Sequence, residues 1–201
     1  MVKRYISPAL LCATLLVAQN QSPTGDSFQR ATPIKVQPTQ VQSSKSKLTI
    51  KQAALQAINS VRTHPQICSK PTTKLNWNKH LYNMSKEHAI DMAVTGLLQH
   101  NGSGTKTDVT ARRLQLPRGT FFYERVNQKI DSKNLLSGEL IIRTSVDTLS
   151  SPKTVLAYWI KNPKNCQLLM DPKFTDFAMA KVISNKDNRA YWTLLLAGRR
   201  K

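Results

Sequence analysis

The chain has 201 residues, of which 30 are lysine or arginine and 11 are aspartate or glutamate, giving a formal charge of +19. Its hydrophobic fraction of 40% excludes disorder throughout, and its 7 glycines and 10 prolines exclude a collagen-like repeat. No apolar run of membrane-spanning length follows the N-terminal region, which excludes a protein with several membrane helices. The excess positive charge predicts an anionic partner or surface.

Residues 1–18 have the pattern of a secretory signal peptide. Lys3 and Arg4 form its basic segment, an apolar stretch runs from Ile6 to Val17, and Ala18 is a small residue at a plausible cleavage point. A single membrane anchor is the alternative, but the apolar stretch is short for a bilayer. We therefore predict export, with a secreted, periplasmic or cell-surface location after cleavage.

Cleavage of the signal peptide discards Cys12 and leaves two cysteines, Cys68 and Cys166. In an exported chain an even pair of cysteines is typical of one disulfide, whereas in a cytosolic chain the same pair would be two buried thiols. Closing a loop of nearly a hundred residues stabilises a fold by roughly 4–5 kcal/mol in the chain-entropy model. The predicted disulfide is therefore a large contribution to stability.

Composition changes sharply along the rest of the chain. Residues 19–47 are rich in Gln, Ser, Thr and Pro and have no hydrophobic period, which predicts a disordered polar tether or a partner-binding tail. Residues 48–201 hold 24 basic and 10 acidic residues, a formal charge of +14, together with periodic apolar positions. We predict one folded domain over 48–201.

The folded region opens with two predicted helices. Thr49 and Gln52 have capping-box spacing, and an apolar stripe continues the first helix until Pro65 ends it. A second helix is predicted over about 79–98. His88 lies in the apolar stripe of this helix, which favours a hydrogen-bonded core histidine over a metal ligand.

The segment after the second helix has weaker patterns. Asp108 is placed to cap a short helix that runs through Leu114. Residues 117–136 leave two interpretations open, because the aromatic side chains at 121–123 could begin a strand or fill the core.

The last third of the chain predicts strands around one helix. Residues 137–146 read as a strand, Ser151 caps a helix that Asn162-Pro163 stops, and 177–183 pairs with 190–197 as a hairpin. Helices come first and hairpin-paired strands come late. This order predicts an α+β fold with a mostly antiparallel sheet, and disfavours a doubly wound parallel sheet.

Several separated motifs occur in one order along the chain. Residues 75–100 contain a Trp-Asn turn, a helix with an internal His followed by Asp-Met, and a closing His. A Gly138-Glu139 strand motif, the segment 159–176 and the Tyr191-Trp192 pair follow. Together they resemble the bacterial exported branch of the CAP superfamily, the SCP-like proteins that include cysteine-rich secretory, antigen 5 and pathogenesis-related proteins.

The resemblance covers about residues 49–197 and implies a three-layer α-β-α sandwich. In the exported bacterial branch, cysteines at the places of Cys68 and Cys166 pair, which supports the predicted disulfide. Family members are linked to sterol or lipid binding, to cell-wall association and to host interaction, and the residues do not choose among these.

The resemblance also implies an open cleft of His and acidic residues, which holds a divalent metal in some members. His100 matches the closing His and Glu139 the strand Glu, whereas Asn165 stands in place of the late-signature His and Leu140 in place of an Asn. One His, one carboxylate and one amide are poor zinc ligands, so we expect no cofactor, or a weak divalent metal with His100 and Glu139 as candidate ligands. An unpaired buried carboxylate is costly, which makes His100 the expected partner of Glu139.

Three classes of function remain open. The first is an exported binding module whose cleft, bordered by His100, Glu139 and Asn165, takes an anionic envelope polymer, a lipid or a host-surface ligand. The second is a hydrolase that uses the His100–Glu139 pair, or Cys166 with His100 if the cysteines are reduced. The third is a basic nucleic-acid-binding protein, although no known motif accompanies the scattered basic residues. A solvated basic surface also fits the charge. We favour the binding module and assign no catalytic residue.

Overall fold

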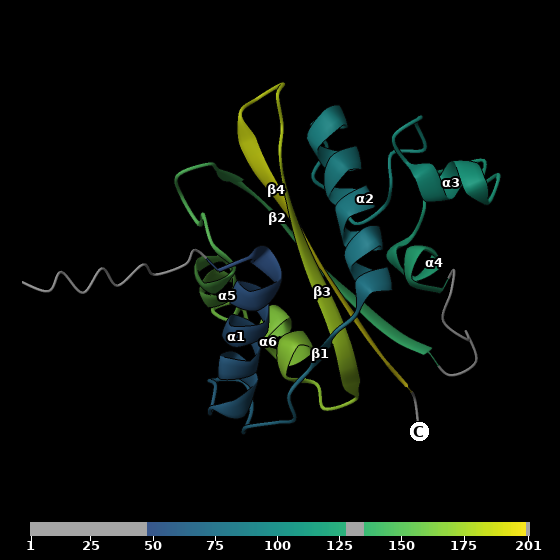
Figure 1. Cartoon of the computed structure of the whole chain (residues 1–201). Helices are drawn as coiled ribbons and strands as arrows, with labels where there is room; N and C mark the ends of the chain where they lie inside the picture. The colour runs from purple at the N-terminus through teal and green to yellow at the C-terminus, as the bar shows by residue number, and fades with distance from the viewer. Residues whose placement is uncertain (1–47, 128–134, 200–201) are drawn as a thin grey trace, which may run out of the picture. The chain divides into compact units, whose positions relative to one another are not determined.

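The computed structural model describes residues 48–127 and 135–199 (Figure 1). The predicted signal peptide and tether lie outside the described residues, and the extent of the folded domain stays a prediction. The helices and strands are α1 (Ile50–Thr63), β1 (Asn76–Trp77), α2 (Lys79–Thr95), α3 (Val109–Arg113), α4 (Phe122–Asn127), β2 (Leu135–Ser145), α5 (Pro152–Trp159), α6 (Pro163–Met170), β3 (Phe174–Ile183) and β4 (Arg189–Arg199).

A sheet of order β1-β3-β4-β2 forms the middle layer of the described part. α1, α5 and α6 lie on one side of it, and α2 and α4 lie on the other (Figure 1). β3 pairs antiparallel with β4 and β4 with β2, whereas the two-residue β1 runs parallel to β3. The α+β class and the three-layer α-β-α sandwich are therefore confirmed. The sheet is mixed because β1, its shortest strand, pairs in parallel while the others pair antiparallel.

Strand β4 shows why the sheet lies between two cores. Alternate side chains of a strand point to opposite faces of the sheet. The side chains of Trp192 and Leu194 therefore face one core and that of Leu195 faces the other, which requires helices on both faces. Trp192 and Leu194 pack with α1 and α5, whereas Leu195 packs with α2 and α4. The strand is buried from Ala190 to Gly198, as expected for a strand covered on both sides.

The predicted helix starts agree with the structure. Capping boxes form at Thr49 and at Ser151, and Asp108 accepts the Ala111 N–H at the start of α3. The second helix ends at Thr95, before the expected 98. Gly96 adopts a φ of 80° there, a left-handed conformation that glycine adopts without steric cost and that stops the helix.

The aromatic run at 121–123 begins helix α4, so the strand alternative was wrong. The Glu124 carboxylate accepts the Phe121 N–H and the adjacent Arg118 pairs with Glu124, which stabilises the first turn. Phe122 packs against the core beneath α2, whereas Tyr123 is exposed. The core at this place is closed by Val126 from the next turn of the helix.

Asn162-Pro163 begins α6 as well as following α5. The Asn162 side chain accepts the backbone N–H groups of Lys164 and Asn165, and Pro163 takes the first helical position, where it has no lost hydrogen bond. The sequence pattern predicted the end of α5 here and did not predict the new helix.

The predicted disulfide is confirmed. Cys68 in the loop after α1 is bonded to Cys166 in α6, with 6.0 Å between their Cα atoms. It therefore joins two segments of the same outer layer. Within residues 48–127 and 135–199, no helix has the length and hydropathy that a bilayer span requires.

Candidate functional site

Glu139 of β2 is the centre of a buried polar cluster. It pairs with Leu195 across the sheet and shares the face that Leu195 presents to α2 and α4. Leu140 packs into the core on the other face. The Glu139 side chain is fully buried. An isolated carboxylate in such a place would be costly, so its partners decide whether the site is stable.

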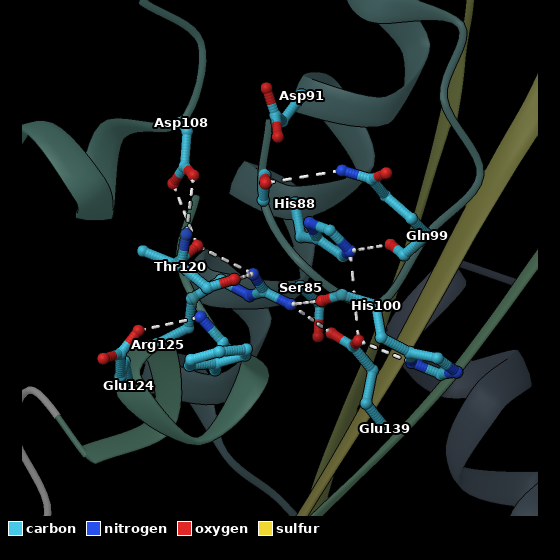
Figure 2. Close-up of polar contacts among 12 residues, drawn as sticks. Ser85, His88, Asp91, Gln99, His100, Asp108, Thr120, Glu124, Arg125 and Glu139 are labelled. Atoms are coloured by element: carbon cyan, nitrogen blue, oxygen red, sulfur yellow. Dashed lines mark hydrogen bonds and ion pairs between the residues drawn. The ribbon is translucent and has the colours of Figure 1, made fainter. Parts of the chain in front are cut away.

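Three side chains surround the Glu139 carboxylate (Figure 2). Arg125 Nη2 lies 2.8 Å from Oε2, and His100 Nδ1 lies 3.0 Å from Oε1. His88 Nε2 is 3.9 Å from Oε1. The predicted contact between His100 and Glu139 is therefore present, and Arg125 is a second partner that the sequence patterns did not identify.

Arg125 is fixed by groups other than Glu139. Its Nη1 donates to the carbonyl and the hydroxyl of Thr120 at 3.2 and 2.8 Å, and its Nη2 donates to the His100 carbonyl at 2.7 Å. Thr120 in turn donates its N–H and its hydroxyl to Asp108, both at 2.9 Å. A chain of hydrogen bonds thus connects the start of α3, through α4, to β2.

His88 is a core histidine, as the helical stripe predicted. Its side chain is buried, and Nε2 donates to the Gln99 carbonyl at 2.9 Å. Burial disfavours the charged imidazolium and lowers the pKa of His88 to about 4, against the opposing attraction of Glu139. His88 is therefore neutral in the folded protein at neutral pH.

The buried neutral His88 predicts a loss of stability in mild acid. The folded state holds the pKa near 4, whereas the unfolded chain protonates near 6.5, so the unfolded state binds more protons between these values. The free energy of unfolding should be constant above about pH 6.5 for this group and fall by roughly 3 kcal/mol as the pH drops towards 4. Urea unfolding of the wild type and of His88→Gln at several pH values measures this.

His64, which is exposed, provides the control for that series. His64→Gln should keep the acid slope of the wild type, whereas His88→Gln should have a shallower slope. Equal slopes for the wild type and His88→Gln would show that His88 does not titrate as described.

Glu139 remains an anion in this setting. Burial by itself would raise the pKa of its carboxyl, but the hydrogen bond from His100 and the charge of Arg125 hold the pKa below its usual value. Both oxygens are engaged, which leaves the carboxylate a poor general base. The His100 side chain is 56% exposed, so the pair has one buried member and one member that faces solvent.

Asn165 lies near the start of α6 and is half-buried. No hydrogen bond between Asn165 and either His100 or Glu139 occurs in the described residues. Asn165 instead lines an open hollow of about 520 Å³ between β2, α5 and α6, to which Leu98 of the loop before His100 also contributes. The other lining residues are Ile141, Ile142, Tyr158, Trp159, Lys161, Asn162 and Pro163.

The residues present do not fit a metal ion. Arg125 and His100 occupy the two oxygens of Glu139, and Asn165 lines a separate hollow. In the described parts of the chain, no cluster of three or more His, Cys, Asp or Glu side chains has the arrangement of a metal site. A metal bound to Glu139 would have to displace either His100 or Arg125 from one of its oxygens.

The three-layer sandwich is the fold expected of an SCP-like domain. The model of CAP, the Cysteine-rich secretory protein family, matches residues 55–196, and the chain belongs to this family. No curated protein matches the sequence.

Solved structures of the same kind are distant in sequence. An outer surface protein from Borrelia burgdorferi is 17% identical, with a TM-score of 0.53 over 73% of this chain and 90% of that chain. An extracellular protein containing a SCP domain from Bacillus anthracis str. Ames is 17% identical, with a TM-score of 0.47 over 77% of this chain and 45% of that chain. Manganese-bound Ac-ASP-7 is 11% identical, with a TM-score of 0.44 over 80% and 76%. The likeness to the Borrelia burgdorferi protein shows a shared fold.

Arg125 is the main site residue that the sequence patterns did not reveal. It lies in the segment 117–136, where neither helical nor strand periodicity was clear. The need of Glu139 for a partner was a usable signal, but His100 already met that need. No spacing pointed to an arginine 14 residues earlier in the chain.

Proposed function

We propose that the chain is an exported CAP binding module that holds an anionic ligand with an apolar body in the hollow between β2, α5 and α6. The composition of that hollow is the observation that carries the proposal. Leu98, Ile141 and Ile142 supply apolar surface, and Lys161 and Asn165 add a positive charge and an amide to the same lining. A volume of about 520 Å³ lies in the range of small-molecule sites.

The state of the His–Glu pair supports binding over hydrolysis. Glu139 is buried and held at both oxygens, so it serves to fix the loop that carries His100. Cys166 is in a disulfide and offers no thiolate to His100. The pair therefore serves as a rigid structural contact, and only the His100 ring reaches solvent.

Export is supported by three observations. Residues 1–18 have the signal-peptide pattern, and the disulfide is of a kind that persists in oxidising compartments. The protein from Borrelia burgdorferi, whose fold this chain shares, is named an outer surface protein. A location outside the cytoplasm disfavours a nucleic-acid partner and favours an envelope or host ligand for the basic domain.

A charge reversal at Lys161 tests the proposal. Lysophosphatidylglycerol, a single-chain anionic lipid, should bind the wild type more tightly than the zwitterionic lysophosphatidylcholine. Lys161→Glu should weaken binding of the anionic lipid about tenfold or more, because a cation–anion contact becomes a repulsion. Titration calorimetry at a concentration below micelle formation measures the affinities.

Lys153→Glu is the matched control, because Lys153 has the same charge and lines a different hollow between α1 and α5. It should leave the affinity unchanged. Equal weakening by both variants would mean that only overall charge matters, and absence of binding by the wild type would reject the lipid-like ligand.

A further inference from the structure

An apolar surface is exposed around the C-terminal half of α2. Four β-branched side chains from three elements contribute to it: Ile90 (37% exposed) and Val94 (53%) from α2, Val109 (47%) from α3 and Ile183 (50%) from β3. Ile90 lines a hollow of about 290 Å³ together with Val109 and a second hollow of about 350 Å³ together with Val94 and Ile183. The four side chains therefore form one continuous surface, here called the α2 surface.

The α2 surface departs from the usual pattern of a helix that covers a sheet. Most of the buried side chains of α2 are apolar, and the outer stripe starts with polar residues at Lys79, Asn83 and Lys86. The same outer stripe then continues with Ile90 and Val94, where polar side chains are expected. Exposed apolar groups gathered in this way commonly mark an interaction site.

The β3–β4 turn is fixed beside this end of α2 (Figure 1). Ser184 Oγ donates to the Ala93 carbonyl at 2.6 Å, and Lys186 Nζ donates to the Thr95 carbonyl at 3.5 Å. The exposed Ile183 is thus held next to Val94 by hydrogen bonds between the two elements. The surface is built into the folded domain and does not depend on a loose loop.

The charged groups at the α2 surface are mainly positive. Lys86 lines the first hollow and Lys186 the second. Glu87 also lines the first hollow, but its carboxylate accepts the Thr110 N–H at 2.6 Å and pairs with Arg113 at 3.4 Å. The carboxylate of Asp187, next to Lys186, accepts the Tyr191 hydroxyl and the Arg189 N–H.

We propose that the α2 surface docks the protein on an anionic lipid bilayer, with the aliphatic side chains in the interfacial region and Lys86 and Lys186 against the headgroups. Apolar side chains bordered by lysines are the pattern of surfaces that lie in a membrane interface. A second copy of the chain is disfavoured as the occupant, because two domains of formal charge +14 would repel each other.

This docking goes beyond the proposed ligand site. None of the four aliphatic side chains or the two lysines lines the hollow between β2, α5 and α6. Ligand binding in the hollow and docking through the α2 surface can therefore be removed by separate substitutions. A result that rejects one proposal does not reject the other.

Vesicle co-sedimentation of the purified full chain tests the docking. The wild type should bind vesicles of phosphatidylcholine mixed with phosphatidylglycerol and should not bind vesicles of phosphatidylcholine alone. The double variant Val94→Asp/Ile183→Asp and the double variant Lys86→Glu/Lys186→Glu should each bind the anionic vesicles about tenfold more weakly or less. All four positions lie at the surface, so the variants should fold, which circular dichroism checks.

Ile67→Asp is the matched control, because Ile67 is 93% exposed in the loop beside Cys68 and lines neither hollow. It should bind the anionic vesicles as the wild type does. A Val94→Trp variant should show a blue shift of its fluorescence on anionic vesicles, and Ile67→Trp should not.

Three results would overturn the docking. The wild type could fail to bind anionic vesicles, or Val94→Asp/Ile183→Asp could bind them as the wild type does, which would leave scattered charge as the cause. The third is a wild-type dimer in analytical ultracentrifugation that Val94→Asp/Ile183→Asp dissociates, which would assign the α2 surface to a second copy of the chain.

Discussion

Replacing Arg125 with methionine is expected to lower the free energy of unfolding by about 3–5 kcal/mol. The substitution keeps much of the side-chain volume but removes the guanidinium that lies 2.8 Å from Glu139. Glu139 has no access to water, so only His100 and the neutral His88 would remain near its negative charge. The Thr120 and His100 carbonyls would also lose the hydrogen bonds that Arg125 donates.

Denaturant unfolding at pH 7 measures this loss, and two variants separate its causes. Arg118→Met removes an exposed arginine that also pairs with a glutamate, Glu124, and should cost much less because solvent screens that pair. The double variant Arg125→Met/Glu139→Gln should recover part of the stability, because it removes the uncompensated charge together with its partner. An Arg125→Met protein as stable as the wild type would mean that Arg125 does not neutralise Glu139.

The pH dependence gives a second readout of the same contact. The pKa of Glu139 is held low by His100 and Arg125, so in the wild type this carboxylate contributes stability that is lost as the pH falls through its folded pKa. Without Arg125 the burial of Glu139 would dominate and raise that pKa. The deficit of Arg125→Met relative to the wild type should therefore shrink as the pH is lowered.

Local sequence patterns predicted the burial of Glu139 and His88, but not the other members of this cluster. Glu139 stood in an apolar strand and His88 in an apolar helical stripe, so burial of both followed from periodicity, and the cost of a buried carboxylate predicted a partner. Arg125 and Thr120 could not be found in that way. Their positions depend on how the loop from α3 to α4 folds back under α2, which is a matter of tertiary packing.

The fold was predictable to a similar depth and for the same reason. Capping residues and hairpin alternation are local, and Thr49, Asp108 and Ser151 start helices where expected. The parallel pairing of Asn76–Trp77 with β3 joins residues a hundred positions apart, and two residues carry no periodicity. The exposed aliphatic side chains of α2 gave no signal either, because an outer and an inner apolar residue differ only in what covers them.

Removing the disulfide with Cys68→Ala/Cys166→Ala is expected to cost about 4 kcal/mol of unfolding free energy. The bond closes a loop of 98 residues, and in the chain-entropy model its effect is to restrict the unfolded chain. The folded layer would keep another connection at the same place, since Arg62 of α1 donates to the carbonyls of Leu169 and Asp171 at the end of α6. The variant should therefore keep its fold at room temperature and melt earlier.

Urea unfolding of this variant and of the wild type, with and without reductant, measures the difference. The reduced wild type should unfold at the same urea concentration as the variant. The ligand-site variant Lys161→Glu, with its disulfide intact, should be as stable as the oxidised wild type. The urea dependence of the free energy should be steeper for the variant, because an unfolded chain without the bond exposes more surface. Equal midpoints for the variant and the oxidised wild type would contradict the prediction.

The bond also bears on the ligand site, because Cys166 directly follows Asn165 in α6. α6 makes up one wall of the hollow, and Asn162 and Pro163 at its start line the hollow as well. If binding requires that wall to be preformed, the variant must order it on binding, and the lipid affinity should fall while vesicle docking through the α2 surface is unchanged. A disulfide that acts on one site and leaves the other unaffected would assign the two surfaces to independent parts of the domain.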